Sequence, residues 1–89
     1  MKPAPSAGEV EVALHHLLRK NQFDDEGYVH VVVVGLKSSP IYLVTLDADV
    51  AKVLGEALAP VIGTRAQPSP TNWVLFRTDA SAILKASNA

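Results

Sequence analysis

Three histidines are, beside the carboxylates, the residues of this chain that could bind a metal or transfer a proton near neutral pH. His15 and His16 are adjacent, so on a helix they point about 100° apart and cannot bind one ion as an i, i+4 pair does. A site built from His16, His30 and an acid of residues 24–26 would need three distant segments to meet on folding. The spacing therefore predicts no metal site and no catalytic histidine.

Other patterns exclude further kinds of chemistry. The acidic residues 24–26 lack the alternating oxygen ligands of a calcium loop, and we expect a solvated turn that blunts a sheet edge. Neither a G-x-S-x-G motif nor a glycine-rich phosphate-binding loop is present. The chain has no cysteine, which excludes disulfides, thiolate zinc sites and iron–sulfur clusters. The sequence thus predicts a protein that is not an enzyme and that binds no cofactor.

The composition is that of an ordinary globular domain: 89 residues, 48% hydrophobic and 19% charged, with a formal net charge of -1. The length fits a single domain over residues 1–89, with a flexible N-terminal arm (1–6) and a frayed tail (86–89). The small net charge argues against a large charged surface for nucleic acid or anionic lipid. The start lacks the apolar core of a signal peptide, and no apolar run approaches the roughly 20 residues that cross a bilayer. We expect a cytoplasmic location and no membrane partner.

Residues 10–20 fit an amphipathic helix better than a strand. At 100° per residue, its apolar side chains fall within one arc of about 140°. These side chains are Val10, Ala13, Leu14, Leu17 and Leu18. Ser6 followed by Glu9 forms the S-x-x-E capping-box pattern, in which each side chain accepts a hydrogen bond from a backbone amide of the first turn. Val12 lies outside the arc and is the one position that argues against this helix.

A second helix is expected to begin after Asp47, which would act as its N-cap. Pro60 lacks the amide that would bond back to Glu56, so the helix is expected to kink or stop there, and Gly63 would close the last turn. Gly55 would allow a close approach of another segment. The expected buried positions are Val50, Val53, Leu54, Ala57, Leu58 and Val61.

Two segments rich in β-branched residues, 28–36 and 41–46, are joined by the short connection 37–40 and should pair as an antiparallel hairpin. Residues 72–78 predict a third strand, and Asp79 could cap a short final helix. The resulting fold class is α+β: a small, mainly antiparallel three-stranded sheet with two amphipathic helices, in the order α-β-β-α-β.

The two hairpin strands carry apolar side chains on both faces, although a half-exposed strand normally alternates apolar with polar residues. If one face were left bare, the segment VHVVVV would be prone to aggregate. We therefore expect a non-catalytic protein-interaction or regulatory module that forms a homodimer. Aromatic residues concentrate in buried interface centres. The expected interface residues are Val29, Val31, Val33, Tyr42, Val44, Trp73 and Phe76.

Two other functions stay open at this point. Arg19, Lys20, Arg65 and Arg77 could form a nucleic-acid surface, because arginine beside an exposed aromatic can stack on unpaired bases. This alternative requires the four cations to share one face. A small enzyme or enzyme subunit would need a concave pocket that holds a titratable group with a shifted pKa.

Overall fold

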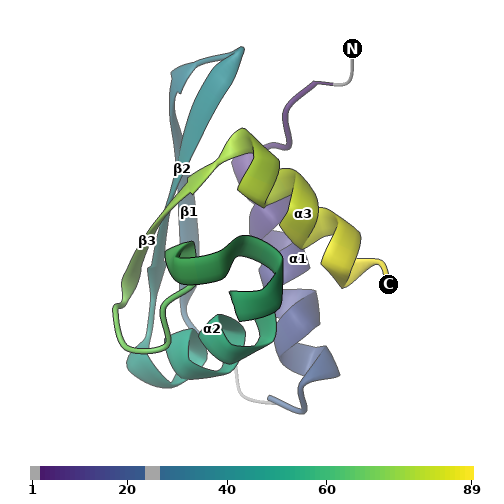
Figure 1. Cartoon of the computed structure of the whole chain (residues 1–89), viewed down its shortest axis with the longest axis vertical. Helices are drawn as coiled ribbons and strands as arrows, with labels where there is room; N and C mark the ends of the chain where they lie inside the picture. Colours follow the sequence, from purple (N-terminus) through teal and green to yellow (C-terminus); the bar gives the residue numbers. More distant parts are fainter. Residues whose placement is uncertain (1–2, 24–26) are drawn as a thin grey trace.

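The computed structural model describes residues 3–23 and 27–89 of the chain. Its strands form one antiparallel sheet in the order β1-β2-β3 (Figure 1). The elements are α1 (Ala7–Lys20), β1 (Val29–Leu36), β2 (Ser39–Leu46), α2 (Ala48–Ile62), the 3-10 turn η1 (Gly63–Arg65), β3 (Asn72–Phe76) and α3 (Arg77–Ser87). The predicted small α+β fold is confirmed, and the optional final helix is present as α3.

All the helices of the described residues lie on one side of the sheet, and the tip of the β1–β2 hairpin extends beyond them (Figure 1). The side chains on the sheet's inner face are buried as far as the helices reach, whereas those between them in the sequence are mostly exposed. The buried set is Val29, Val31, Tyr42, Val44, Leu46, Trp73 and Leu75. The fold therefore has two layers, and the other face of the sheet is uncovered.

The first helix follows its sequence signals closely. Ser6 Oγ accepts a hydrogen bond from the Glu9 amide at 3.1 Å, and Glu9 Oε1 accepts one from the Ser6 amide at 3.1 Å. The predicted capping box is therefore confirmed. The five predicted apolar positions are the ones that α1 buries, and Val12 is 66% exposed.

The second helix differs from the prediction on one side. Val61 is 40% exposed, whereas Ala51, Gly55 and Ile62 are buried. The buried arc is shifted because the backbone of Gln67 and Pro68 packs against Gly55, which puts a further segment of the chain on that side of α2. This close approach is possible because glycine has no Cβ.

The C-terminal ends of α2 and β3 also differ from those predicted from the sequence. The helix continues through Pro60 to Ile62, because a proline in the last turn removes only one backbone hydrogen bond, and Gly63 then adopts a φ of 65°. Strand β3 stops at Phe76, two residues earlier than predicted. Asp79 Oδ2 accepts a hydrogen bond from the Phe76 amide at 2.8 Å, which places Asp79 within the first turn of α3 and not at its cap.

The tight contact at Gly55 gives a test of the packing. An added Cβ would lie 2.7 Å from the Pro68 nitrogen and 2.8 Å from the Pro68 Cα, so the backbone would have to move. Gly55→Ala should therefore lower the free energy of unfolding by about 1–3 kcal/mol, although alanine favours a helix. Urea unfolding followed by circular dichroism measures the change.

The matched control is Gly8→Ala in α1, where the added Cβ would meet nothing closer than Ser6 Oγ at 3.9 Å. That variant should be as stable as the parent or up to about 1 kcal/mol more stable. A Gly55→Ala protein that gains stability like the control would contradict the close approach of Pro68.

Candidate interaction surface

The uncovered face of the sheet is ordered in three rows by the register of the strands. We refer to it as the open sheet face. The polar row contains His30, Thr45 and Asn72, and the two apolar rows contain Val32, Leu43 and Val74, and Val34, Ile41 and Phe76. The apolar rows lie adjacent to each other on the side of the hairpin tip. The Tyr28 ring lies beside the polar row, because it stacks on the His30 ring with 6.3 Å between the ring centroids.

The two apolar rows are exposed to an extent that is unusual for neighbouring large side chains. Val32, Val34 and Leu43 are 40–41% exposed, Phe76 is 44% exposed and Val74 is 51% exposed. None of the nine positions is an Asp, Glu, Lys or Arg. Single exposed apolar residues are normal on a protein surface, but a contiguous patch of them indicates an interaction site.

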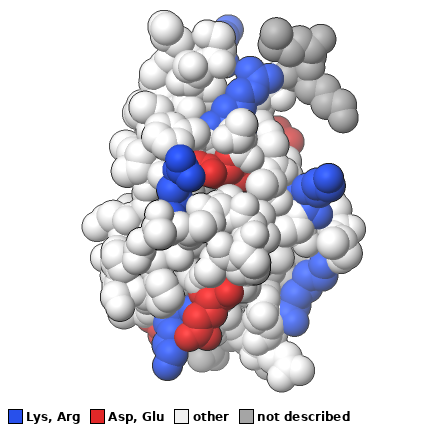
Figure 2. All heavy atoms as spheres, viewed as in Figure 1, with Lys and Arg blue, Asp and Glu red and all other residues white. Residues whose placement is uncertain are grey.

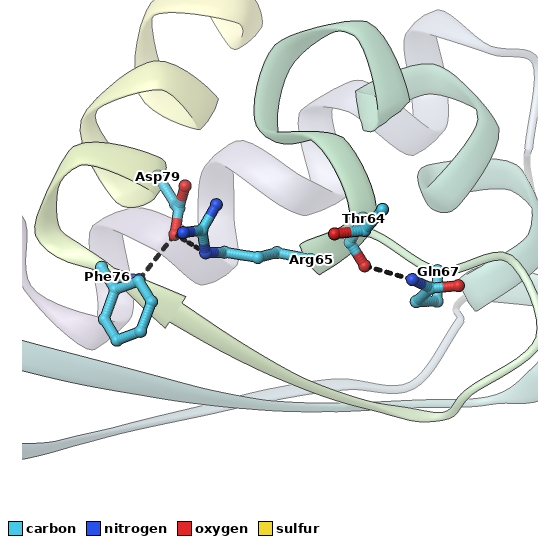
Figure 3. Close-up of polar contacts among 5 residues, drawn as sticks. All are labelled: Thr64, Arg65, Gln67, Phe76 and Asp79. Atoms are coloured by element: carbon cyan, nitrogen blue, oxygen red, sulfur yellow. Dashed lines mark hydrogen bonds and ion pairs between the residues drawn. The ribbon is translucent and has the colours of Figure 1, made fainter.

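The β3 side of this face is bounded by an ion pair. Arg65 Nε lies 3.3 Å from Asp79 Oδ2, and the guanidinium carbon of Arg65 lies 5.0 Å from the centroid of the Phe76 ring (Figure 3). The same Asp79 oxygen accepts the Phe76 amide, so one carboxylate holds both partners. The Phe76 ring is therefore held at the rim beside a cation and is not available on that side as a stacking platform.

The free edge of β1 is partly occupied by a side chain from α1. Glu11 Oε1 accepts a hydrogen bond from the Val31 amide at 3.2 Å. An added strand would need that amide as a donor. Glu11 thus opposes pairing of β1 with another strand, at the segment where valines are densest.

Removal of this carboxylate should expose the edge. Glu11→Ala leaves the Val31 amide unpaired within an uncharged valine-rich strand, which is the setting in which strands add to one another. We expect a shorter lag time for fibril formation, followed by thioflavin fluorescence with shaking at 37 °C. Glu56→Ala, at an exposed position of α2, makes the same charge change away from the edge and should leave the lag time unchanged. Equal lag times in the two variants would show that Glu11 does not protect the edge.

Of the interface residues expected from the sequence, Phe76 alone lies on the open sheet face. Val29, Val31, Tyr42, Val44 and Trp73 are at most 7% exposed and form part of the chain's own core beneath the helices. Val33 and Phe76 are 39% and 44% exposed. Val33 belongs to the inner face near the hairpin tip, whereas Phe76 belongs to the open sheet face. The expected set omits the central row of that face, Val32, Leu43 and Val74. Both faces of the strands carry apolar side chains, so the sequence does not indicate which face the helices cover.

Tyr42 has a structural role that its sequence position did not reveal. Its hydroxyl donates a hydrogen bond to the Pro5 carbonyl at 2.6 Å and so holds the arm that precedes α1. Burial raises the pKa of the Tyr42 phenol above its usual value of 10.0; Arg77 opposes this rise and Glu9 adds to it. The neutral phenol is the form that the fold favours.

Tyr42→Phe tests this contact. Loss of the hydrogen bond should lower the free energy of unfolding by about 1 kcal/mol at pH 7. Because the raised pKa stabilises the fold only while the phenol is neutral, that contribution is complete below about pH 10 and declines as pH rises towards the higher folded-state pKa. The stability difference between parent and variant should therefore narrow above about pH 10, as measured by urea unfolding. Tyr28→Phe, at a 52% exposed ring, should show neither effect, and a similar loss there would contradict the assignment.

The four cations of the nucleic-acid alternative are not brought onto one surface. Lys20 Nζ donates to the Ser87 carbonyl at 3.3 Å and also contacts the Ala89 carbonyl, at the C-terminal end of α3. Arg77 begins that helix, so its backbone lies about 15 Å from Ser87. Arg65 pairs with Asp79 near the beginning of α3, and Arg19 lies beside Lys20 in α1. On the face seen in Figure 2, Lys and Arg are scattered, with acidic groups between them.

The histidines are similarly separated. His16 Nδ1 lies 3.2 Å from Ser87 Oγ, between α1 and α3, whereas His30 lies on the open sheet face. The acidic residues 24–26 of the weighed metal site lie outside the described residues. Among residues 3–23 and 27–89, no group of three or more His, Asp or Glu side chains could hold a metal ion.

A hollow of about 540 Å³ lies between the N-terminal arm and the hairpin tip. Pro3 and Pro5 form one side, Val33 and Pro40 form another, and Lys37 and Arg77 also line it. The lining contains a serine, Ser38, but no histidine or carboxylate that could act as its base. Tyr42, the group for which a pKa shift is resolved among the described residues, is absent from the lining.

Comparisons with protein-family models, with curated proteins and with solved structures find no match to this chain. In the part of the chain that the structure describes, no helix combines the length and the apolar character needed to cross a membrane. Inference about function therefore rests on the geometry of the surface itself.

Proposed function

We propose that this chain is a small, non-catalytic protein-interaction module that self-associates through its open sheet face. The observation that carries the proposal is the pair of adjacent apolar rows on a face that no helix of the described residues covers. Burial of apolar surface is worth about 25 cal/mol per Å², so covering both rows would provide a substantial driving force for association. Exposed alone, the same rows would promote non-specific aggregation.

The lack of charge on the face favours a protein partner over nucleic acid. A surface that binds single strands needs a basic groove and aromatic rings on which bases can stack. Here the central row is Val32, Leu43 and Val74, and none of these side chains offers a ring. The Phe76 ring lies against Arg65, which is itself paired with Asp79.

The first test is the mass of the protein in solution. Light scattering behind a sizing column, at several concentrations and at low and high salt, should give twice the 9.5 kDa of one chain. The dimer should be insensitive to salt, because its interface is apolar. Leu43→Lys places a charge at the centre of the face and should raise the dissociation constant at least tenfold, which corresponds to more than about 1 kcal/mol.

The matched control is Val12→Lys, which puts the same charge on a 66% exposed valine of α1, away from the sheet. It should dimerise like the parent. Circular dichroism and thermal unfolding must first show that both variants are folded. A parent that is monomeric at every concentration would overturn self-association, and a folded Leu43→Lys dimer would place the interface elsewhere.

A further inference from the structure

The open sheet face has the composition that a two-fold interface requires. In such an interface the same patch is used twice, so that a residue near the axis contacts its own copy in the partner. A charge at that position would meet a like charge, whereas apolar and neutral polar side chains are compatible with themselves. All nine positions of the face are free of Asp, Glu, Lys and Arg. A charged partner would find no complementary group there, whereas a second copy of this chain presents the same uncharged apolar rows.

The edges of the sheet are less suited to receive a second copy. On β1, the Val31 amide already donates to Glu11. On β3, the Phe76 amide already donates to Asp79, and the Arg65 side chain lies beside the ring. A dimer that extended the sheet would have to break one of these contacts on each copy. Packing of face against face breaks neither of them.

Two in-plane directions are possible for the two-fold axis of such a dimer. Sheets that pack face to face keep their strands within about 30° of each other, so the axis runs either along the strands or across them. An axis along β2 sets each row on the same row of the partner, and polar atoms then meet polar atoms. An axis across the strands, centred on the apolar rows, would instead set the polar row over the hairpin tip, where Leu36 is 74% exposed. That arrangement would bury His30 against the partner's copy of this apolar side chain.

We infer that two copies pack face to face about a two-fold axis that runs along β2, with Leu43 opposite the partner's Leu43. This inference rests on the proposed function, because it assumes that the open sheet face mediates self-association. The product is a four-layer sandwich in which the two sheets are inside and the helices of each copy are outside. Its polar row also lies on the partner's polar row, which lets Thr45, His30 and Asn72 form hydrogen bonds across the interface.

The size of the face sets the expected strength. β1 and β2 have eight residues each, and at about 3.4 Å per residue and about 4.8 Å between strands the face measures roughly 27 Å by 14 Å. Its side chains make the accessible area larger than this flat projection. Two such faces give about 760 Å² of flat area, which is below the roughly 1,200 Å² at the lower end of stable interfaces, so the dimer is expected to be weak. The dimer should therefore dissociate on dilution, and this is detectable in the same mass measurements.

The axis can be located with spin labels, because the chain contains no cysteine that would compete for the label. Ser39→Cys places one label per chain at the hairpin end of β2, at an exposed position. With the axis along β2, the two hairpin ends lie together and the labels should be within about 20 Å of each other. With the axis across the strands and centred between the two apolar rows, Ser39 lies three residues from the axis, so the two Ser39 backbones should be roughly 23 Å apart, against about 10 Å with the axis along β2. With β1 paired edge to edge, the hairpin ends point apart and the distance should be about 30 Å.

Two controls accompany this measurement. Lys85→Cys labels the exposed side of α3 and should give a longer distance than Ser39→Cys, because both sheets lie between the labels. Ser39→Cys combined with Leu43→Lys should lose the short distance. A dimeric mass with a long Ser39 distance would overturn the axis and leave the proposed self-association intact. A monomeric mass with no dipolar coupling would overturn both.

Discussion

The structure depends on one asymmetry: a three-stranded sheet with apolar side chains on both faces is covered by helices on only one of them. Short connections impose this arrangement. Asp47 is the only residue between β2 and α2, and α3 follows β3 without a linker. The Asp47 carboxylate accepts the Tyr28 amide at 3.1 Å, so it joins the beginning of β1 to the beginning of α2 instead of capping its own helix. Both helices leave the sheet at once on the side where Tyr42 and Trp73 are buried, and the described chain has no element left for the other face.

Signals that act within one turn of the chain could be predicted from the sequence, whereas contacts made in the folded state could not. The capping box of Ser6 and Glu9 involves neighbours only, and the buried stripe of α1 follows from its own periodicity. The arc buried by α2 shifted because Pro68, thirteen positions beyond Gly55, packs on it. The beginning of α3 shifted for a similar reason, since Asp79 binds the Phe76 amide that would otherwise continue β3.

The proposed interface shows the same limit more sharply. Val31 and Val32 are the same residue type one position apart, and the alternation of a strand places them on opposite faces. One is 5% exposed and the other 41% exposed. Nothing in either residue, or in the residues beside it, indicates which face the helices will cover. That choice depends on how the connections direct α2 and α3, so the sequence predicted the existence of a two-sided sheet but selected mainly the covered side as the interface.

The contacts at the rim explain how such a sheet can expose an apolar face and still remain a discrete molecule. A strand edge offers backbone donors to any extended chain, whereas a face offers only side chains whose packing depends on shape. Glu11 accepts the Val31 amide on one edge, and Asp79, which is paired with Arg65, accepts the Phe76 amide on the other. Growth by strand addition is therefore opposed at both ends of the sheet, while the uncharged centre around Leu43 is left free. The proposed association through the face would be closed once two copies had met, because each copy would then have no second open face to offer.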